Sequence, residues 1–338
     1  MEHRHVINDA HELIGLGEPA HGDTALADAR FDLFTRLVED GVRSIAVESD
    51  RVAAFAADDY VQGRGGTLDT AMSEGFTHGF GAFAVNRRLI AWMREYNEHR
   101  APADRVAFHG MDGPFEFTAA SPRVHLEHVR DHLGLDLDLA PLAGEEEQWS
   151  RTEAVTDPAA SPGDTPGAHR LRAIADDLHA ALYTQAPQSI AATDRTAWDR
   201  ARIHATTALG LLRYHRQAAQ RLDEAERWSR LSGVRDALMA QNLLDIRNLE
   251  DGRGPTAVLA HNIHLQRNES RMEMAGMNLT WNGTGAIIAA LLGPKYLFIA
   301  GALGSAAPKD LGGADAVLHA GDGEATLTPA PEARPHQR

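Results

Sequence analysis

The chain of 338 residues has no cysteine and only two lysines, and none of its apolar runs reaches the ~18 residues that a transmembrane helix needs. The lack of cysteine excludes disulfides, thiolate zinc sites, iron–sulfur clusters and a cysteine nucleophile. The first residues lack the apolar stretch of a signal peptide. We therefore expect a cytoplasmic protein without a membrane-spanning segment.

Several catalytic signatures are also missing. The sequence has no G-x-S-x-G nucleophile elbow, no H-E-x-x-H zinc motif and no phosphate-binding G-x-x-x-x-G-K. Residues 15–20 do fit the dinucleotide fingerprint G-x-G-x-x-A. However, Pro19 and His21 occupy the turn that a pyrophosphate would approach, and the next strand-end acid, Glu48, comes too late in the chain. These features argue against a serine α/β-hydrolase and a nicotinamide enzyme.

The charge balance is acidic, with 33 basic against 48 acidic residues and a net charge of −15. Such a balance repels nucleic acid and anionic membrane surfaces. The length suits one large α/β domain with an insertion, or two domains. We expect a small-molecule substrate as partner, and the oligomeric state stays open.

Short apolar runs that end abruptly in polar residues indicate strands buried on both faces of a parallel sheet. They cover residues 11–17, 43–47, 106–110, 256–260 and 296–300, and helical spacing marks residues 25–40 and 84–100. From 118 to 253 the pattern is helical throughout. We therefore predict an α/β core over 1–117 and 254–320, a helical insertion over 118–253 and a disordered tail over 321–338.

Polar residues follow four of these predicted strands. Ligands of open parallel sheets bind beyond the carboxyl ends of the strands, so these side chains are expected to converge at one edge. They are Glu18 and His21 after the first strand, Glu48 after the second, Asp112 after the third, and His261 and His264 after the fourth.

The chemistry that such a set supports is the activation of water. Histidine can take a proton near pH 7, and a neighbouring carboxylate stabilises the imidazolium that forms. The same residue types are also ligands for zinc, iron or manganese. The residue types alone leave both interpretations open, and a metal site would use Glu18, His21, Glu48, His261 and His264.

Other histidines have plainer interpretations. His109 lies within a predicted strand and is expected to be a core histidine. His125, His128 and His132 follow a helical spacing and are expected to form a solvated face.

Six stretches, in order along the chain, resemble the motifs of erythromycin-esterase-like proteins. They are GLGEPAHG at 15–22, SIAVESD at 44–50, AWMREYN at 91–97, VAFHGMD at 106–112, VRDALMAQN at 234–242 and AHNIH at 260–264. The resemblance implies a mostly parallel sheet with helices on both faces, and a helical insertion that forms one wall of the active-site cleft.

The resemblance also implies roles for single residues. His21 would be the general base and Glu48 its partner, with Glu18, Arg30, His261 and His264 around the same pocket. Asp112, Arg235, Asn242 and Asn262 would contact substrate. The implied reaction is hydrolysis of an ester or lactone of a macrolide- or polyketide-like natural product, in antibiotic resistance or in biosynthesis, without a covalent acyl-enzyme.

Three alternatives remain at this stage. The same His and Glu residues could catalyse elimination, epimerisation or cyclisation in a biosynthetic pathway. The protein could be a metal-dependent hydrolase, although we expect no cofactor. It could also bind a small molecule without catalysis.

Overall fold

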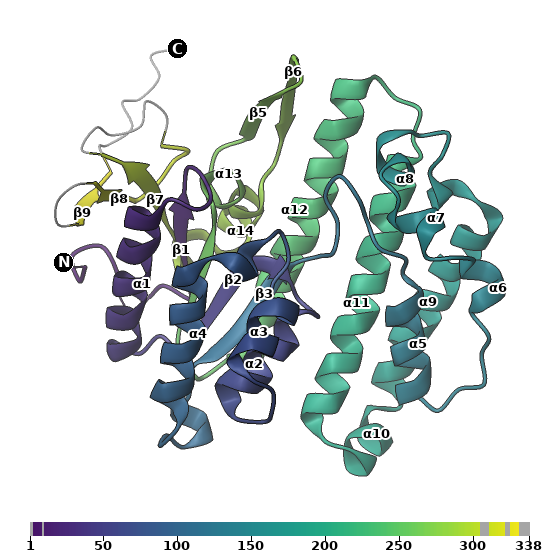
Figure 1. Ribbon diagram of the computed structural model, residues 1–338, viewed down its shortest axis with the longest axis horizontal. Coiled ribbons are helices and arrows are strands. Elements are labelled where there is room, and N and C mark those ends of the chain that lie inside the picture. The colour runs from purple at the N-terminus through teal and green to yellow at the C-terminus, as the bar shows by residue number, and fades with distance from the viewer. Residues whose placement is uncertain (1–2, 9, 305–310, 322–324, 331–338) are drawn as a thin grey trace. The chain divides into compact units, whose positions relative to one another are not determined.

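The computed structural model describes residues 3–8, 10–304, 311–321 and 325–330, which form two compact units (Figure 1). The first unit consists of two segments, one that ends at Asp112 and one that begins at Met239. The second unit is Gly113–Leu238. The first unit is an α/β unit built on a mostly parallel sheet, which confirms the predicted fold class.

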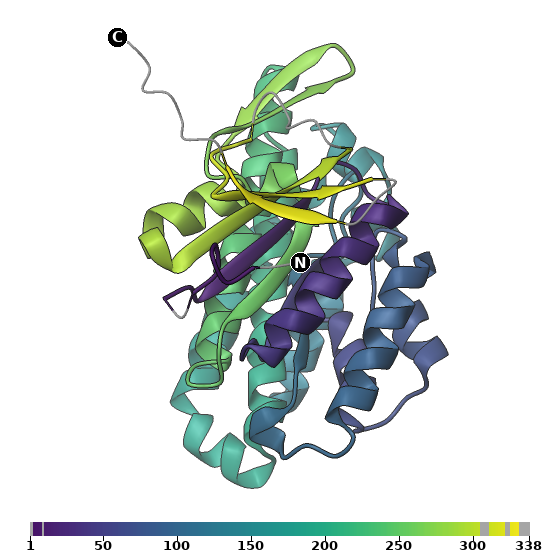
Figure 2. The ribbon, with the colours of Figure 1, turned by 90° about the vertical axis from the view of Figure 1, so that its left-hand side faces the viewer.

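The sheet of the first unit has seven strands in the order β3-β2-β4-β1-β7-β8-β9. All neighbours are parallel except β8 and β9. Figure 2 shows the N-terminal strand and helix beside the C-terminal strands, in agreement with the pairing of β1 and β7. The strands are β1 (Leu13–Glu18), β2 (Ser44–Asp50), β3 (Ala107–Asp112), β4 (Thr256–His261), β7 (Tyr296–Leu303), β8 (Ala316–Ala320) and β9 (Thr326–Pro329).

Helices cover both faces of this sheet because strand side chains alternate between the faces. Ile14 and Leu16 of β1 join the core beneath helices α1 to α4, whereas Leu13 joins the core that holds Leu265, Ile288 and the end of α12. The helices are α1 (Thr24–Glu39), α2 (Ala54–Gln62), α3 (Leu68–Glu74), α4 (Ala84–Asn97), α13 (Asn262–Leu265) and α14 (Thr284–Leu292), with short 3-10 turns η1 (Phe80–Ala82), η2 (Pro102–Asp104) and η4 (Gly293–Lys295).

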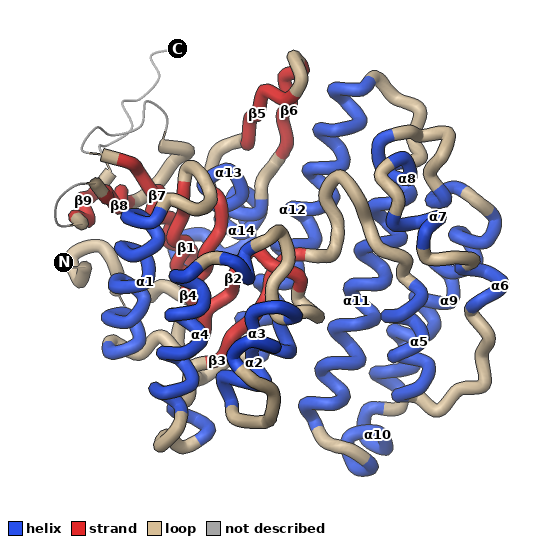
Figure 3. The backbone as a smooth tube through the Cα atoms, in the orientation of Figure 1, coloured by secondary structure: helices blue, strands red, loops and turns tan. Residues whose placement is uncertain are grey.

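The regular elements that lie wholly within the second unit are helices, as Figure 3 shows in blue. Their core gathers Leu126, Trp149, Leu171, Leu178 and Leu212. The helices are α5 (Arg123–His132), α6 (Ala140–Ala143), α7 (Glu147–Ser150), α8 (Glu153–Thr156), η3 (Pro162–Asp164), α9 (Pro166–Thr184), α10 (Ala186–Ala192) and α11 (Arg195–Ala218), and α12 (Glu224–Leu249) starts here.

The structure departs from the predicted boundaries in two places. The second unit ends within α12, because Met239, Leu243 and Ile246 pack into the core of the sheet unit. Part of the predicted disordered tail is a strand, since the β-branched segment of β9 pairs antiparallel with β8. The remaining tail residues, 322–324 and 331–338, lie outside the described residues.

The hairpin of β5 (Ser270–Met274) and β6 (Met277–Trp281) was not predicted. It forms a separate two-stranded sheet, visible as the upright pair of strands in Figure 1. Among the described residues, no helix combines the length and the apolar character needed to cross a membrane.

Candidate active site

The strand order brings the predicted strand-end residues into one row. β2, β4 and β1 are adjacent, and Glu18 and His261 are direct register partners across β1 and β4. Glu48 lies on β2, on the other side of β4. Because these strands are parallel, their carboxyl ends open at the same edge of the sheet.

His21 lies in the short loop between β1 and α1. Asp23 ends this loop and caps α1 by accepting a hydrogen bond from Leu26 N. His21 Nδ1 is 2.9 Å from Glu18 Oε1, and His21 Nε2 is 4.0 Å from Glu48 Oε1. The hydrogen-bonded partner is therefore Glu18, the last residue of β1 and three residues before His21, whereas Glu48 faces the second ring nitrogen.

The two carboxylates raise the pKa of His21 above its ordinary value. The hydrogen bond to Glu18 is the largest cause, burial opposes it, and the charge of Glu48 adds to it. Both carboxylates favour the imidazolium, so His21 binds a proton more tightly than an isolated imidazole does.

Arg30 on α1 holds Glu18 from the other side. Its Nη2 donates to Glu18 Oε2 and its Nη1 donates to Leu16 O. Arg30 and Glu18 are both buried, so each charge is compensated by the other in a place where an unpaired charge would be costly.

Glu48 is almost fully buried and collects contacts from three histidines. Its Oε2 accepts from the backbone N–H of His261 at 2.8 Å, and its Oε1 lies 3.4 Å from His264 Nε2 and 4.0 Å from His21 Nε2. The structure thus groups Glu18, His21, Arg30, Glu48, His261 and His264, the six residues predicted to be catalytic.

Both ring nitrogens of His261 bind main-chain groups. Nδ1 accepts from Ile263 N at 3.1 Å, which caps α13, and Nε2 is 2.8 Å from Pro19 O. Since Nδ1 accepts, Nε2 carries the proton and donates. Burial lowers the pKa of His261, and the two hydrogen bonds of its ring fasten β4 to the His21 loop.

Asn262 connects two strand ends. Its Nδ2 donates to Gly301 O at 2.9 Å, and its Oδ1 accepts from Gly301 N at 3.1 Å. A Cβ at Gly17 would lie 2.0 Å from Asn262 Oδ1, so glycine at position 17 makes room for this amide. The structure thus places Asn262, predicted to contact substrate, in a bond between β7 and the end of β4.

Asp112 lies in a second cluster at the ends of β2 and β3. It is fully buried, its backbone is the register partner of Asp50, and its Oδ2 is 3.6 Å from His78 Nε2. Burial raises the pKa of Asp50 to about 6. His78 was not among the predicted site residues, and in the structure it precedes Gly79 in a turn where both residues have positive φ.

The two remaining residues that were predicted to contact substrate, Asn242 and Arg235, lie outside the group around His21. Asn242 on α12 donates to Met111 O at 2.9 Å and accepts from Arg51 Nη1 at 3.0 Å. Arg235 belongs to the second unit, where its Nη1 is 3.5 Å from Glu116 Oε1.

A separate histidine cluster lies within the second unit, and here the expectation of a solvated face was wrong for one residue. His125 is buried, with its Nδ1 3.1 Å from His204 Nδ1. His128 is exposed but stacks on His204, with ring centroids 3.8 Å apart. His109 is paired with Glu250 in the first unit, at 2.7 Å.

The described residues contain no group of three or more His, Cys, Asp or Glu side chains that could hold a metal ion. His261, one of the residues that a metal site would use, has both ring nitrogens engaged by main-chain groups.

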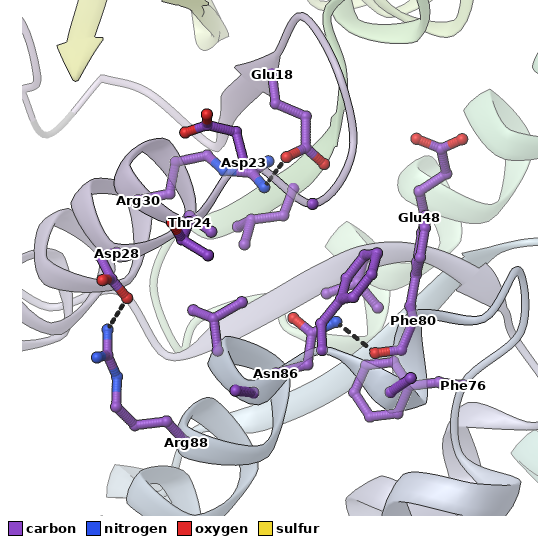
Figure 4. A pocket seen from close by; sticks show the side chains of 18 of the residues that line it. Glu18, Asp23, Thr24, Asp28, Arg30, Glu48, Phe76, Phe80, Asn86 and Arg88 are labelled. Atoms are coloured by element: carbon purple, nitrogen blue, oxygen red, sulfur yellow. Dashed lines mark hydrogen bonds and ion pairs between the residues drawn. The ribbon is translucent and has the colours of Figure 1, made fainter. Parts of the chain in front are cut away.

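A cavity of about 470 Å³ opens within the first unit, with Glu18, Arg30 and Glu48 in its wall. Figure 4 shows Glu18 and Arg30 on one side of it and Glu48, with Phe80 below it, on the other. An aromatic ring thus stands next to the acidic and basic groups, and the Phe80 and His21 ring centroids are 4.9 Å apart.

A family model described as erythromycin esterase matches residues 37–323, which is most of the chain. The match includes Glu48, His261 and His264 and begins after the loop that carries Glu18 and His21. A comparison with curated proteins gives no match.

Solved structures share the fold at low identity. A succinoglycan biosynthesis protein is 17% identical, with a TM-score of 0.63 over 87% of this chain and 66% of its own. A Bacillus cereus protein is 17% identical, with a TM-score of 0.63 over 89% of this chain and 68% of its own. An open conformation of a mutant of the erythromycin esterase EreC is 19% identical, with a TM-score of 0.62 over 96% of this chain and 78% of its own. The chain thus spans about two thirds of the length of the first two.

Proposed function

Since the chain belongs to the erythromycin esterase family, we propose that it is a hydrolase that cleaves an ester or lactone of a natural-product substrate with water activated by His21. The observation that carries the proposal is the arrangement of His21 between two carboxylates. Nδ1 is hydrogen-bonded to Glu18 and Nε2 is directed to Glu48.

This arrangement fixes the tautomer of the base. Because Glu18 accepts from Nδ1–H, the lone pair of neutral His21 is on Nε2, on the side of Glu48. A water molecule between His21 Nε2 and Glu48 Oε1 would be oriented by both groups, which lie 4.0 Å apart. The pKa of His21 is raised, so the ring has a high affinity for the proton that the water gives up.

The reaction then runs in two steps. The water oxygen bonds to the carbonyl carbon while its proton passes to His21 Nε2, and the carbonyl oxygen becomes an oxyanion next to Arg30. The bond from carbon to the leaving oxygen then breaks, and His21 returns the proton to that oxygen. An ester gives an acid and an alcohol, whereas a lactone gives one hydroxy acid.

The direct test is His21→Ala, with the folded state checked by circular dichroism. A panel of macrolides and simple activated esters serves as substrates, and turnover is followed by mass spectrometry. Loss of a general base is expected to lower kcat by about 10²–10⁴-fold. Unchanged turnover in a folded His21→Ala protein would refute the role of His21.

Labelled water separates hydrolysis from the biosynthetic alternatives. Hydrolysis in H₂¹⁸O places one ¹⁸O atom in the carboxylate of the product. A product without the label would show elimination, epimerisation or cyclisation instead. A ligand that is bound tightly but returned unchanged, by both the wild type and His21→Ala, would show a binding protein.

A further inference from the structure

The cavity beside the catalytic group has a polar end and an apolar body. Glu18, Arg30 and Glu48 form part of its wall at the ends of β1 and β2 and on α1. The rest of the cavity lies between α1 and the segment 76–88, away from Glu48 (Figure 4). Its volume of about 470 Å³ is in the range of small-molecule sites.

The apolar body is built from phenylalanines in and around the turn η1. Phe76, Phe80 and Phe83 line it, together with Val47 and Val85. The Phe80 and Phe83 rings stack with centroids 5.6 Å apart. His78 and Gly79 have positive φ angles and form the turn that precedes Phe80. The backbone conformation of this turn therefore sets the position of Phe80 in the cavity wall.

The charges on the wall are mostly acidic. Glu18, Glu48, Asp23 and Asp28 stand against Arg30 and Arg88. Both arginines are already engaged, Arg30 by Glu18 and Arg88 by Asp28 at 2.8 Å. A negatively charged acyl group would meet two arginines that each already bind a carboxylate of the wall, whereas a neutral apolar group would meet the phenylalanines.

The position of His21 determines whether the acyl part or the alcohol part of an ester occupies the cavity. His21 is not part of the cavity wall, and its side chain is about one third exposed. In the proposed reaction His21 must return a proton to the leaving oxygen, so the alcohol part lies on the exposed side of His21. The acyl part, attached to the carbonyl beside Arg30, is then directed into the cavity.

We propose that this cavity is an acyl-binding pocket that selects esters with an uncharged, apolar acyl chain of medium length. The inference rests on the proposed hydrolase function and adds the substrate class. Burial of each methylene group is worth roughly a fourfold gain in kcat/KM, up to the length that the pocket accepts.

The test uses p-nitrophenyl esters, in which the leaving group stays constant and only the acyl chain changes. For the wild type, kcat/KM is expected to rise at least about 50-fold from acetate to octanoate. The p-nitrophenyl monoester of adipic acid, whose chain ends in a carboxylate, is expected to react more slowly than the neutral hexanoate. Acetyl esters of longer alcohols should show no comparable increase.

Two substitutions fill the pocket from opposite walls. Val85→Trp on α4 and Ala27→Leu on α1 are each expected to reduce the octanoate-to-acetate ratio at least tenfold. Leu291→Trp places the same indole on an exposed position of α14 and should leave the ratio unchanged. Suppose that acetate is hydrolysed but the wild type shows no preference for octanoate, or that both pocket variants keep the wild-type octanoate-to-acetate ratio. Either result would refute the acyl pocket and leave the proposed hydrolase function standing.

A binding measurement keeps the inference testable if none of these esters is hydrolysed. Octanamide and acetamide are uncharged analogues of the two acyl groups and can be titrated calorimetrically. The proposal expects octanamide to bind at least tenfold more tightly than acetamide to the wild type and to lose this advantage in Val85→Trp. Equal binding of the two amides would refute the pocket.

Discussion

The histidines at the sheet edge and the histidines of the helical unit differ in what surrounds them. At the sheet edge, His21 is placed between Glu18 and Glu48, and its pKa is raised. In the helical unit, His125 faces another imidazole, that of His204. Burial lowers the pKa of His125 to about 4 and that of His204 to about 3.

In the helical unit burial is the largest cause of the lowered pKa values, whereas at His21 the hydrogen bond to Glu18 outweighs burial. His125 and His204 are more buried than His21, and the structure pairs their rings with each other. They remain neutral at physiological pH and serve packing. At His21 two carboxylates stabilise the charged form of the ring, which supports the proposed role of His21 in proton transfer.

The largest expected effect comes from removing the hydrogen-bonded carboxylate. Glu18→Gln removes the negative charge beside His21 and leaves one amide oxygen where His21 Nδ1 and Arg30 Nη2 each use a carboxylate oxygen of Glu18, so kcat should fall roughly 10²-fold or more. The pKa of His21 should also fall, which moves the acid limb of the pH–rate profile to lower pH. Steady-state kinetics from pH 5 to 9 would measure both changes.

Glu18→Gln also leaves the buried Arg30 unpaired, which can destabilise the fold. The double variant Glu18→Gln with Arg30→Gln removes this charge and is the appropriate control for stability. A folded double variant with an unchanged acid limb would contradict the role assigned to Glu18.

A smaller effect is expected for Glu48→Gln. The amide can still accept from His261 N, but the charge that helps to raise the pKa of His21 is lost. We expect kcat/KM to fall about tenfold and the acid limb to move to lower pH by less than in Glu18→Gln. If Glu48→Gln shifts the acid limb further than Glu18→Gln does, Glu48 and not Glu18 makes the larger contribution to the raised pKa of His21.

The smallest effect concerns stability and is confined to the helical unit. The unfolded chain protonates His125 near its ordinary pKa of 6.5, whereas the folded chain does so only near 4. The unfolded state therefore binds more protons in this window, and the free energy of unfolding falls as the pH drops from about 6.5 toward 4. Each such histidine contributes up to about 1.4 kcal/mol per pH unit.

His125→Asn keeps a hydrogen-bond donor for His204 but removes one titrating ring. The loss of stability on acidification should become less steep, as measured by urea unfolding at pH 6.5, 5.5 and 4.5. His169→Asn, at an exposed position, is the matched control and should keep the wild-type slope. An unchanged slope in His125→Asn would show that the imidazole pair does not control acid stability.

The sequence was most informative where a buried strand ends. The apolar runs that precede Glu18, Glu48, Asp112 and His261 each became a strand of the parallel sheet, because short, mostly apolar runs bounded by polar residues are typical of strands buried on both faces. The convergence of these ends follows from the parallel order and needs no knowledge of side-chain positions.

Contacts between side chains were harder to predict from the sequence. Glu48 was predicted to be the partner of His21, but the rotamer of His21 in the loop places its Nδ1 against Glu18. His125 has the same helical spacing as a solvated face, and only the packing of α5 against α11 buries it. The hairpin of β5 and β6 alternates methionine with polar residues, a pattern too weak to predict a strand pair.

The bond between Asn262 and Gly301 has a consequence for the glycine spacing at residues 15–20. In a nucleotide-binding loop the second glycine gives a pyrophosphate access to the backbone. Here the space above Gly17 is filled by the protein's own amide, and the space above Gly15 by the hydroxyl end of Tyr296. The same spacing of small residues therefore accommodates internal packing. A methyl group at position 17 would push apart the ends of the strands that carry the imidazoles.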